Sequence, residues 1–315
     1  MAATLDLVPI DLSILIVTYD SSDEIVACLD SIGFPDGLAG EVVIVDNQSS
    51  DDTVATIEAH PSPVRLVVSP LNSGFGAGVN LAAAHAQGAY LLLLNPDAVL
   101  APDCIPRLLE LASQRPDATL CGGVTHMSDG TRNPHTIRRL PSLRTLFAFA
   151  TGWTWVAPPR LRPEYVELPP AGLVEAEMIT GSLMLIRREN FTGLNGFDER
   201  FFMYGEDTDL CARIVEGGGV ILVDTSASIT HDGGASTRSE GRKLAMMMAG
   251  KVTYLRIRWS GLRRAVGLAL VWTGCALRAV AGLVHPGTRR WTDAWRLRSW
   301  WWSGYRPDGP HVPPS

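Results

Sequence analysis

The sequence predicts an α/β fold, in which helices flank a mostly parallel β-sheet and a helical, basic and aromatic tail follows. Apolar runs that suit buried strands alternate with helical patterns through the first half of the chain, and this alternation is typical of parallel sheets. The 315 residues are 46% hydrophobic and 19% charged, which is the balance of a folded globular protein. After Thr237 the chain becomes helical, aromatic and basic.

Four apolar runs are predicted to be strands because each is nearly continuous, as a strand buried on both faces should be. They cover residues 12–18, 41–46, 64–69 and 89–95. The spacing of apolar residues predicts four helices between or after these strands. They cover 22–32, a segment after the second strand that ends at residue 57, 75–87 and 101–114. Asp51 or Asp52 is placed to cap the second of these helices, and Pro102 suits the first turn of the fourth.

Later segments are less regular. Residues 128–172 are rich in Pro and Arg with weak periodicity, so we expect an irregular insertion or lid. Regular structure should resume at 174–188, followed by a helix from about 205 to 216 and a strand at 219–223.

Charge divides the chain into an acidic and a basic part. Residues 1–241 hold 14 Arg and no Lys against 31 Asp and Glu, whereas residues 242–306 hold 13 Lys and Arg against Asp293 alone. We therefore expect the tail to meet an anionic partner, either nucleic acid or a membrane surface. The five cysteines form no C-x-x-C pair, which fits a reducing cytoplasm. No secretory signal peptide is expected, because the first ten residues carry no Lys or Arg and no long apolar run.

Polar residues follow all four predicted strands, and they are Thr18-Tyr19-Asp20, Asp46-Asn47-Gln48-Ser49-Ser50, Asn72-Ser73-Gly74 and Asn95-Pro96-Asp97. Ligands of open parallel sheets bind beyond the carboxyl ends of the strands. One such end is ordinary turn chemistry, but four at one edge favour a site for a polar ligand.

Two common nucleotide-binding classes are excluded by their missing glycine motifs. A dinucleotide-binding oxidoreductase needs G-x-G-x-x-G after the first strand, and this turn reads TYDSSDE. The cluster GFGAG at 74–78 follows the third strand instead. A Walker A motif is also absent, because the only lysines are Lys243 and Lys251.

Asp97, beside Asn95 at a predicted strand end, is placed to offer a hard oxygen ligand to Mg²⁺ or Mn²⁺. Further ligands would come from phosphates and from elsewhere in the chain; the alternative is that Asn95-Pro96-Asp97 forms only a turn. His231 is either a structural histidine or a partner for Asp97 on the metal. Arg238 and the backbone N–H groups before it suit phosphate oxygens.

An acidic and aromatic stretch covers residues 196–218. Its five acids within twelve residues are Asp198, Glu199, Glu206, Asp207 and Asp209. Acids in a first helical turn are favoured by the helix dipole alone. The alternative is that one carboxylate serves as a general base in an aromatic-walled pocket, where desolvation raises its basicity.

The chain resembles the family 2 glycosyltransferases, which have the GT-A fold, and more narrowly their bacterial rhamnosyltransferase-like members. The segments that carry the resemblance are ILIVTYDS, VVIVDNQSSDDT, NSGFGAGVNLAAAHAQGAYLLLLNPD, MITGSLMLIRRENFTGLNGFDERFFMYGEDTDLCARI and ITHDGGAST. They run in the family's order over roughly residues 11–238, and the ordered set is highly specific. The resemblance implies a GT-A catalytic domain over 1–238, including the insertion 128–172, and a membrane-associating helical region over 239–315.

The resemblance also implies how the donor binds. Thr18, Tyr19 and Asp46 would hold the nucleobase and ribose of a nucleotide-sugar. Asn72 and Asn80 would shape that pocket.

Catalytic roles follow from the same resemblance. Asn95-Pro96-Asp97 stands where most members have D-x-D, so Asp97 would bind the divalent cation on the donor diphosphate, and His231 would complete that site. The missing first acid leaves the strictness of metal dependence open. Asp207 would be the catalytic base, with Glu206 supporting it.

The implied reaction is an inverting displacement, in which the base deprotonates an acceptor hydroxyl as it attacks the anomeric carbon. The cation and Arg238 would neutralise the leaving nucleoside diphosphate. We expect transfer of rhamnose from dTDP-rhamnose to a polyprenyl-diphosphate-linked saccharide in cell-envelope polysaccharide synthesis. The alternatives are a UDP-hexose-dependent transferase with another acceptor and a catalytically inactive scaffold of a polysaccharide-assembly complex.

The tail bears on localisation. Residues 262–284 are apolar but interrupted by Arg278, and their clean run, 265–277, is short of the ~20 residues of a spanning helix. They form either a buried core helix or a helix in the membrane interface, flanked by Arg263-Arg264 and the Trp/Arg-rich stretch 289–306. We expect a peripheral protein on the cytoplasmic face of the bacterial plasma membrane, with no nucleic-acid partner. The sequence leaves the acceptor, the linkage and a homo-oligomer open.

Overall fold

The protein, described here by a computed structural model over residues 10–231, 239–306 and 312–313, is built on a central β-sheet. The sheet order is β3-β2-β1-β4-β10-β6-β11-β5, and β8 pairs with β11 beside this path. Its strands are β1 (Leu12–Thr18), β2 (Gly40–Asp46), β3 (Arg65–Val68), β4 (Tyr90–Leu94), β5 (Val99–Leu100), β6 (Ala118–His126), β8 (Leu173–Glu175), β10 (Leu183–Arg187) and β11 (Val220–Thr230). A separate two-stranded sheet pairs β7 (Ile137–Arg138) with β9 (Met178–Ile179).

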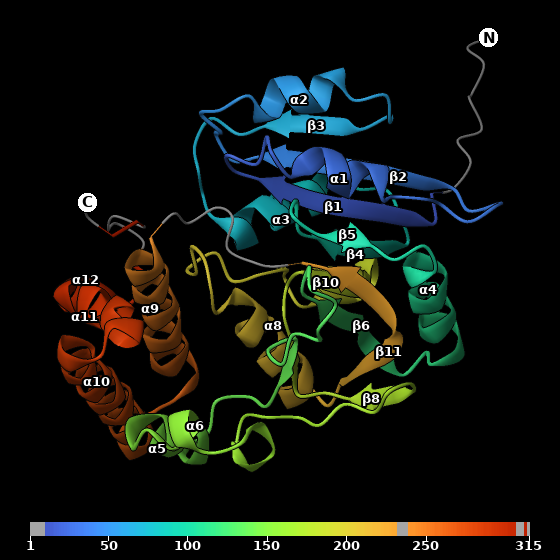
Figure 1. Cartoon of the computed structure of the whole chain (residues 1–315). Coiled ribbons are helices and arrows are strands. Elements are labelled where there is room, and N and C mark those ends of the chain that lie inside the picture. Colours follow the sequence, from blue (N-terminus) through green and yellow to red (C-terminus); the bar gives the residue numbers. More distant parts are fainter. Residues whose placement is uncertain (1–9, 232–238, 307–311, 314–315) are drawn as a thin grey trace, which may run out of the picture.

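Helices cover the sheet and form a bundle beside it (Figure 1). Those that belong to the sheet domain are α1 (Ile25–Asp30), α2 (Thr53–Ala59), α3 (Phe75–His85), α4 (Cys104–Gln114), α7 (Arg188–Gly193) and α8 (Glu206–Glu216). Those that build the bundle are α5 (Leu143–Ala150), α6 (Trp153–Val156), α9 (Glu240–Arg258), α10 (Gly261–Val284), α11 (Arg289–Arg296) and α12 (Arg298–Trp301). Two short 3₁₀ turns complete the elements, η1 (Pro159–Leu161) and η2 (Pro286–Thr288).

The predicted α/β fold with a mostly parallel sheet is confirmed. Strands β1, β2, β3 and β4 are mutually parallel, and both faces of the sheet are buried. Along β1, Ile14 and Ile16 face the core under α1 and α4, whereas Leu15 and Val17 face the core under α3 and α8. This two-residue alternation explains why each strand reads as a continuous apolar run.

The second half of the sheet adds features that the sequence pattern did not reveal. Strand β10 runs antiparallel between β4 and β6, and β11 continues seven residues beyond the predicted end at 223, to Thr230. Helix α4 begins at Cys104, two residues after Pro102. Asp52 occupies the N-cap of α2 without a side-chain bond, while Asp51 accepts the Thr53 N–H at 3.0 Å.

The stretch 128–172 contains β7, α5, α6 and η1 among its irregular segments. Helix α5 packs closely on α10, because a Cβ on Gly274 of α10 would lie 2.5 Å from the Phe149 ring. Arg278 fixes the same contact: only 2% exposed, it donates to the Phe149 carbonyl and to Thr154 Oγ1. The charge that interrupts the apolar run thus joins the insertion to the C-terminal bundle.

Among the described residues, α10 is the one helix whose length and composition would allow it to cross a membrane. One third of its most apolar window is buried against the bundle. The tryptophans of the stretch 289–306 pack on the bundle: Trp301 is 1% exposed, and Trp295 and Trp302 contact Trp272 of α10 with ring centroids 4.7 and 5.1 Å apart. Trp301 belongs to the core of the bundle and the other four are half-buried against it, so contact of this stretch with a membrane stays a prediction.

Candidate active site

A cavity of about 630 Å³ opens at the carboxyl ends of β1, β4 and β11. Its wall is completed by the start of α8, by residues 125–138 and by α9. Parallel strands bring their last residues to one edge of a sheet, so the polar residues after them face a shared space. Thr18, Tyr19, Asn72, Asn95 and Asp97 all line this cavity, together with His231, Glu206 and Asp207.

Three polar side chains meet at the sheet end of the cavity. His231, directly after β11, places Nε2 3.0 Å from Asp97 Oδ1 and 3.2 Å from Asn95 Nδ2. A single imidazole nitrogen is either a donor or an acceptor and cannot satisfy both neighbours at once. The arrangement is therefore one that a further group would complete.

A divalent cation fits this group of donors. Asp97 Oδ1 and His231 Nε2 lie 3.0 Å apart, and a carboxylate oxygen with a neutral imidazole nitrogen would be a suitable pair of ligands for such an ion. The described residues contain no cluster of three or more His, Cys, Asp and Glu that could hold an ion. A cation here would have two protein ligands, as Mg²⁺ does when substrate phosphates provide the rest.

Two acids stand at the other side of the cavity, where α8 begins. Glu206 is 5% exposed, and its Oε2 has no hydrogen-bond partner. Burial and the neighbouring Asp207 raise the pKa of Glu206 to about 8, so this side chain is mostly protonated at neutral pH. Asp207 is half-buried and accepts the Thr208 N–H at 2.6 Å, which leaves carboxylate oxygen free to accept a proton from a ligand.

The loop before these acids is held in an uncommon backbone conformation. Tyr204 and Gly205 have φ values of 63° and 108°, both in the left-handed region. A Cβ on Gly250 of α9 would lie 1.7 Å from the Tyr204 carbonyl oxygen, so α9 touches the loop backbone directly. Tyr305 Oη donates to the Met203 carbonyl at 2.6 Å. The C-terminal region thus fixes the position of the acids.

The expected nucleobase and ribose residues lie in two layers. Tyr19, 37% exposed, lines the cavity, as do Thr18 and Asn72. Asp46 is fully buried behind this wall, where its carboxylate accepts bonds from Thr18 Oγ1 at 3.0 Å and from the Ser49 N–H at 2.9 Å. Asp46 therefore fixes the ends of β1 and β2, and its contact with a donor stays a prediction.

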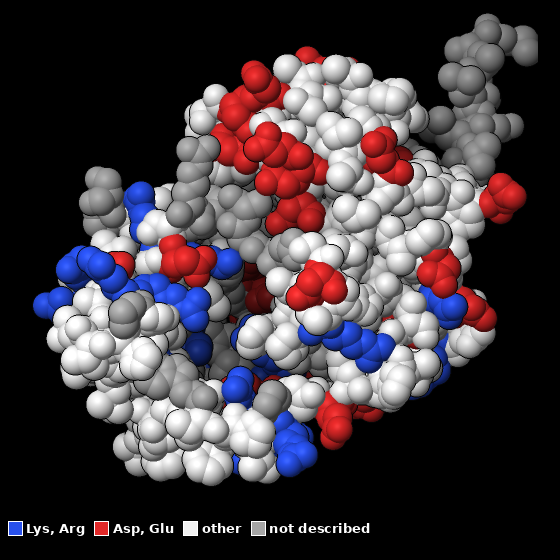
Figure 2. All heavy atoms as spheres, viewed as in Figure 1, with Lys and Arg blue, Asp and Glu red and all other residues white. Residues whose placement is uncertain are grey.

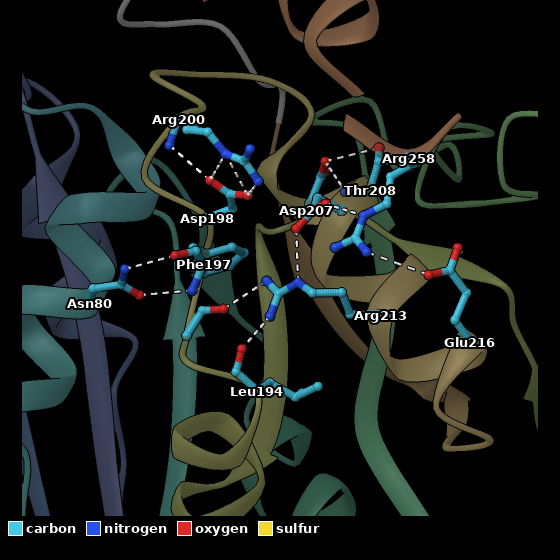
Figure 3. A network of polar contacts seen from close by, with 12 residues as sticks. Asn80, Leu194, Phe197, Asp198, Arg200, Asp207, Thr208, Arg213, Glu216 and Arg258 are labelled. Carbon is cyan, nitrogen blue, oxygen red and sulfur yellow. Dashed lines mark hydrogen bonds and ion pairs between the residues drawn. The ribbon is translucent and has the colours of Figure 1, made fainter. Parts of the chain in front are cut away.

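Asn80 lies outside the cavity lining, on α3 (Figure 3). Its side chain pairs with both backbone groups of Phe197, at 2.8 and 2.9 Å, and donates to Glu199 at 3.0 Å. This amide binds α3 to the acidic stretch 196–218, and so it shapes the site indirectly.

The other acids of that stretch are structural. Asp198, with 18% of its side chain exposed, pairs with Arg200. Asp209 is fully buried between Arg213 of α8 and Arg258 of α9, at 2.8 and 2.7 Å, and so links the two helices; Figure 3 shows Arg258 beside α8, which carries Arg213. Of the five acids, Glu206 and Asp207 alone line the cavity.

Several cavity residues were missed by the sequence analysis. Arg132 and Arg138 come from the stretch 128–172, and Lys243 and Met247 come from α9. Their segments lack the strand-end signal that marked the others, although the chain's only two lysines both lie on this helix. The cavity therefore uses residues from both sides of the predicted boundary at 238, while Arg238 itself lies outside the described residues.

The fold and the site define a class of protein. A mixed sheet that carries carboxylate, amide and hydroxyl side chains at its strand ends, around a cavity that suits a nucleotide, is the GT-A architecture of glycosyltransferases. The sequence pattern of the family described as "Glycosyl transferase family 2" matches residues 13–192, and that of "N-terminal domain of galactosyltransferase" matches residues 172–228. The chain belongs to glycosyl transferase family 2, and it is a glycosyltransferase.

Relatives and a solved structure support this assignment. The chain is 32% identical over 281 residues to N-acetylglucosaminyl-diphospho-decaprenol L-rhamnosyltransferase of Mycobacterium tuberculosis, covering 83% of this chain and 88% of the relative. It is 26% identical to rhamnosyltransferase WbbL of Escherichia coli, covering 64% and 75%. The crystal structure of GalNAc-T7 with UDP, GalNAc and Mn²⁺ superposes with a TM-score of 0.56 over 80% of this chain and 51% of that one, at 15% identity.

Proposed function

We propose that this protein is an inverting rhamnosyltransferase that moves rhamnose from dTDP-rhamnose to a saccharide carried on a polyprenyl diphosphate, in cell-envelope polysaccharide synthesis. The observation that carries the proposal is the convergence of Asp97, His231, Glu206 and Asp207 on one cavity. The similarity to the mycobacterial enzyme, which extends over most of both chains, supports the choice of sugar and acceptor.

The mechanism follows from the positions of the two acids. Asp207 accepts the proton of an acceptor hydroxyl while that oxygen attacks the anomeric carbon and the bond to the nucleoside diphosphate breaks. The leaving group takes the bonding electrons, and the attack from the opposite face inverts the anomeric centre. Glu206, protonated beside it, adds no second negative charge to repel the donor.

The donor diphosphate is expected at Asp97 and His231. A Mg²⁺ or Mn²⁺ ion held by these two residues would supply positive charge to the departing diphosphate. Thr18, Tyr19 and Asn72 line the cavity beside them and are proposed to hold the nucleoside, and Asp46 is proposed to act by holding Thr18 in place. Arg238 is proposed as a further diphosphate contact.

A membrane surface is proposed for the outside of the bundle. Phe147, Trp153 and Val156 on α5 and α6 are 60%, 47% and 79% exposed, and Val280 and Leu283 on α10 are 62% and 72% exposed. We call these five residues the apolar face. In Figure 2 the lobe that carries α5, α6 and α10 is mostly uncharged, with Lys and Arg gathered along its upper edge. Exposed apolar side chains next to cations suit the surface of an anionic bilayer, which favours peripheral attachment to the cytoplasmic face of the plasma membrane.

The test is a transfer assay with the purified chain. It would be given dTDP-rhamnose, UDP-glucose or UDP-N-acetylglucosamine, each with a prenyl-diphosphate-linked N-acetylglucosamine and with Mn²⁺, Mg²⁺ or EDTA. We expect a rhamnosylated lipid from dTDP-rhamnose, with loss of turnover in EDTA. Transfer from a UDP-sugar alone would replace the proposed donor. Release of no nucleoside diphosphate from any donor would identify a scaffold.

A further inference from the structure

Cations line the cavity on the side away from the strand ends. Arg138 is the last residue of β7, and Lys243 projects from α9. Resting on the proposed function, we propose that Arg138, Lys243 and Lys251 form a subsite for the diphosphate of the lipid-linked acceptor. This subsite is separate from the position of the donor diphosphate at Asp97 and His231.

Arg138 is the central residue of the proposal. Its Nε is buried without a hydrogen-bond partner, and no hydrogen bond or ion pair found among the described residues involves its guanidinium. A guanidinium carries five N–H donors in a planar fork that matches phosphate oxygens. A buried charged donor without a partner lowers the stability of the folded protein. Binding of an anion by Arg138 would remove this cost.

The two lysines extend this positive surface along α9. Lys243, Met247 and Lys251 are spaced four residues apart, which places them on one face of the helix, and the first two line the cavity. Lys251 packs its Nζ 4.8 Å from the centre of the Phe149 ring. Burial, with Arg138 and Arg278 nearby, lowers the pKa of Lys251 to about 8.

No direct ion pair among the described residues neutralises the cluster. Arg278 is occupied by the Phe149 carbonyl and by Thr154. Glu164 is the carboxylate that acts on Lys251, and its own Oε2 is buried without a partner, so it forms no ion pair with either cation. A diphosphate placed between Arg138 and the lysines would supply the missing negative charge and would raise the pKa of Lys251 again.

The order of groups across the molecule matches the order of groups in such an acceptor. Glu206 and Asp207 stand where the acceptor sugar must react, and Arg138 and Lys243 line the same cavity. Lys251 comes next and contacts Phe149 of α5, and Phe147, two residues away, is 60% exposed on the apolar face. The acceptor sugar would thus lie at the two acids, its diphosphate at the cations and its lipid at the apolar face.

The first experiment measures binding without turnover. A saturating nucleoside diphosphate with Mn²⁺ would fill the donor site, and protection against thermal unfolding by farnesyl diphosphate would be compared with that by farnesol. Any diphosphate bound in place of the donor would be displaced by the nucleotide. The variants are Arg138→Gln, Lys243→Gln and, as the matched control, Arg139→Gln, an exposed neighbour outside the cavity.

We expect farnesyl diphosphate to protect the wild type and the Arg139→Gln control against thermal unfolding. Farnesol should protect neither protein. Arg138→Gln and Lys243→Gln should each weaken this binding tenfold or more, the size expected for one lost charge-assisted hydrogen bond. Equal protection of all four proteins, or no protection of the wild type by farnesyl diphosphate, would overturn the subsite. Unfolding temperatures without ligand would show whether each variant is folded. If Arg138→Gln does not fold, Lys243→Gln still tests the subsite.

A second experiment separates this proposal from the proposed function. Transfer to a diphosphate-linked acceptor would be compared with transfer to the same sugar on a neutral glycoside. Arg138→Gln should raise KM tenfold or more for the diphosphate acceptor and leave KM for the neutral acceptor and for the donor unchanged. Equal losses with both acceptors would contradict the subsite while the proposed function stands. A wild type that binds farnesyl diphosphate but transfers to no lipid would contradict the proposed function alone.

Discussion

Glu206 shows how the environment of one side chain determines its charge. It lies at the first position of α8 with 5% of its surface exposed, beside a second carboxylate. Burial disfavours the ionised form, and the adjacent Asp207 adds to the effect. A protonated Glu206 lets the two acids stand side by side at the cavity without mutual repulsion.

This raised pKa predicts a pH-dependent stability. The folded pKa is about 8, whereas a glutamate in an unfolded chain has a pKa of about 4.3. Between these values the folded protein binds one more proton than the unfolded chain, so its free energy of unfolding falls as pH rises. Glu206→Gln removes this penalty. The unfolding temperature of the variant should exceed that of the wild type by a margin that grows from pH 5 to pH 8 and then levels off.

The control is Glu189→Gln, which replaces an exposed acid on α7. Its unfolding temperature should follow that of the wild type at every pH. If the curves of Glu206→Gln and wild type run parallel across this range, Glu206 is already ionised in the folded protein.

Several of the site residues that the sequence predicted share one signal, which is their place after an apolar run. Asn95, Asp97 and His231 were found in this way, and the structure brings His231 within hydrogen-bond distance of both Asn95 and Asp97. Arg138 and Lys243 carry no such signal, because an arginine in an irregular stretch and a lysine on a helix are ordinary surface residues. Only the tertiary packing of α9 and the insertion brings them to the cavity.

At the scale of elements, α9 is a support for the catalytic loop. Gly250 allows α9 to touch the Tyr204 carbonyl, and Arg258 pairs with the buried Asp209 of α8. Helical periodicity predicted that this segment is a helix, but not which surface it covers. The sequence predicted regular structure over 174–188 but not the direction of β10, because an antiparallel strand between β4 and β6 has the same apolar pattern as a parallel one.

Gly250→Ala tests this support. A Cβ placed 1.7 Å from the Tyr204 carbonyl must displace the loop that leads to Asp207, and a misplacement of about 1 Å can cost about 10²-fold in rate. We expect kcat to fall by about that factor in the transfer assay. Gly193→Ala is the matched control, because a Cβ there meets no atom within 4 Å, and its kcat should match that of the wild type. Equal rates for both variants would show that the close contact is not needed for the loop.

At the scale of the whole molecule, acidic, basic and apolar side chains occupy different parts of the surface. Figure 2 shows acidic residues over the N-terminal sheet domain and basic residues along the C-terminal bundle. The charge asymmetry of the sequence predicted this division. The apolar face was only partly predictable, because the tryptophans of 289–306 pack against the core of the bundle, whereas α5 and α6 of the insertion supply exposed apolar side chains.

The apolar face predicts which substitutions release the protein from membranes. Phe147→Asp and Val280→Asp each place a charge where an apolar side chain would enter the lipid, so vesicle affinity should fall tenfold or more, since burial of one such side chain contributes about 1.5–3 kcal/mol. Cosedimentation with phosphatidylglycerol-containing vesicles measures this effect. Val68→Asp is the control, because Val68 is 56% exposed on β3 in the sheet domain, and it should bind vesicles as the wild type does. Unchanged binding by all three variants would place the membrane contact elsewhere.

The central claim is that the strand ends and α8 build one cavity in which Asp207 takes the proton from the acceptor. The most direct measurement is single-turnover transfer by Asp207→Asn, with Asp198→Asn as a control for an acid of the same stretch that pairs with Arg200 outside the cavity. The account predicts a 10²–10⁴-fold lower rate for Asp207→Asn, with nucleotide-sugar affinity within about twofold of the wild type, and an unchanged rate for Asp198→Asn. An Asp207→Asn variant that transfers sugar at the wild-type rate would contradict it.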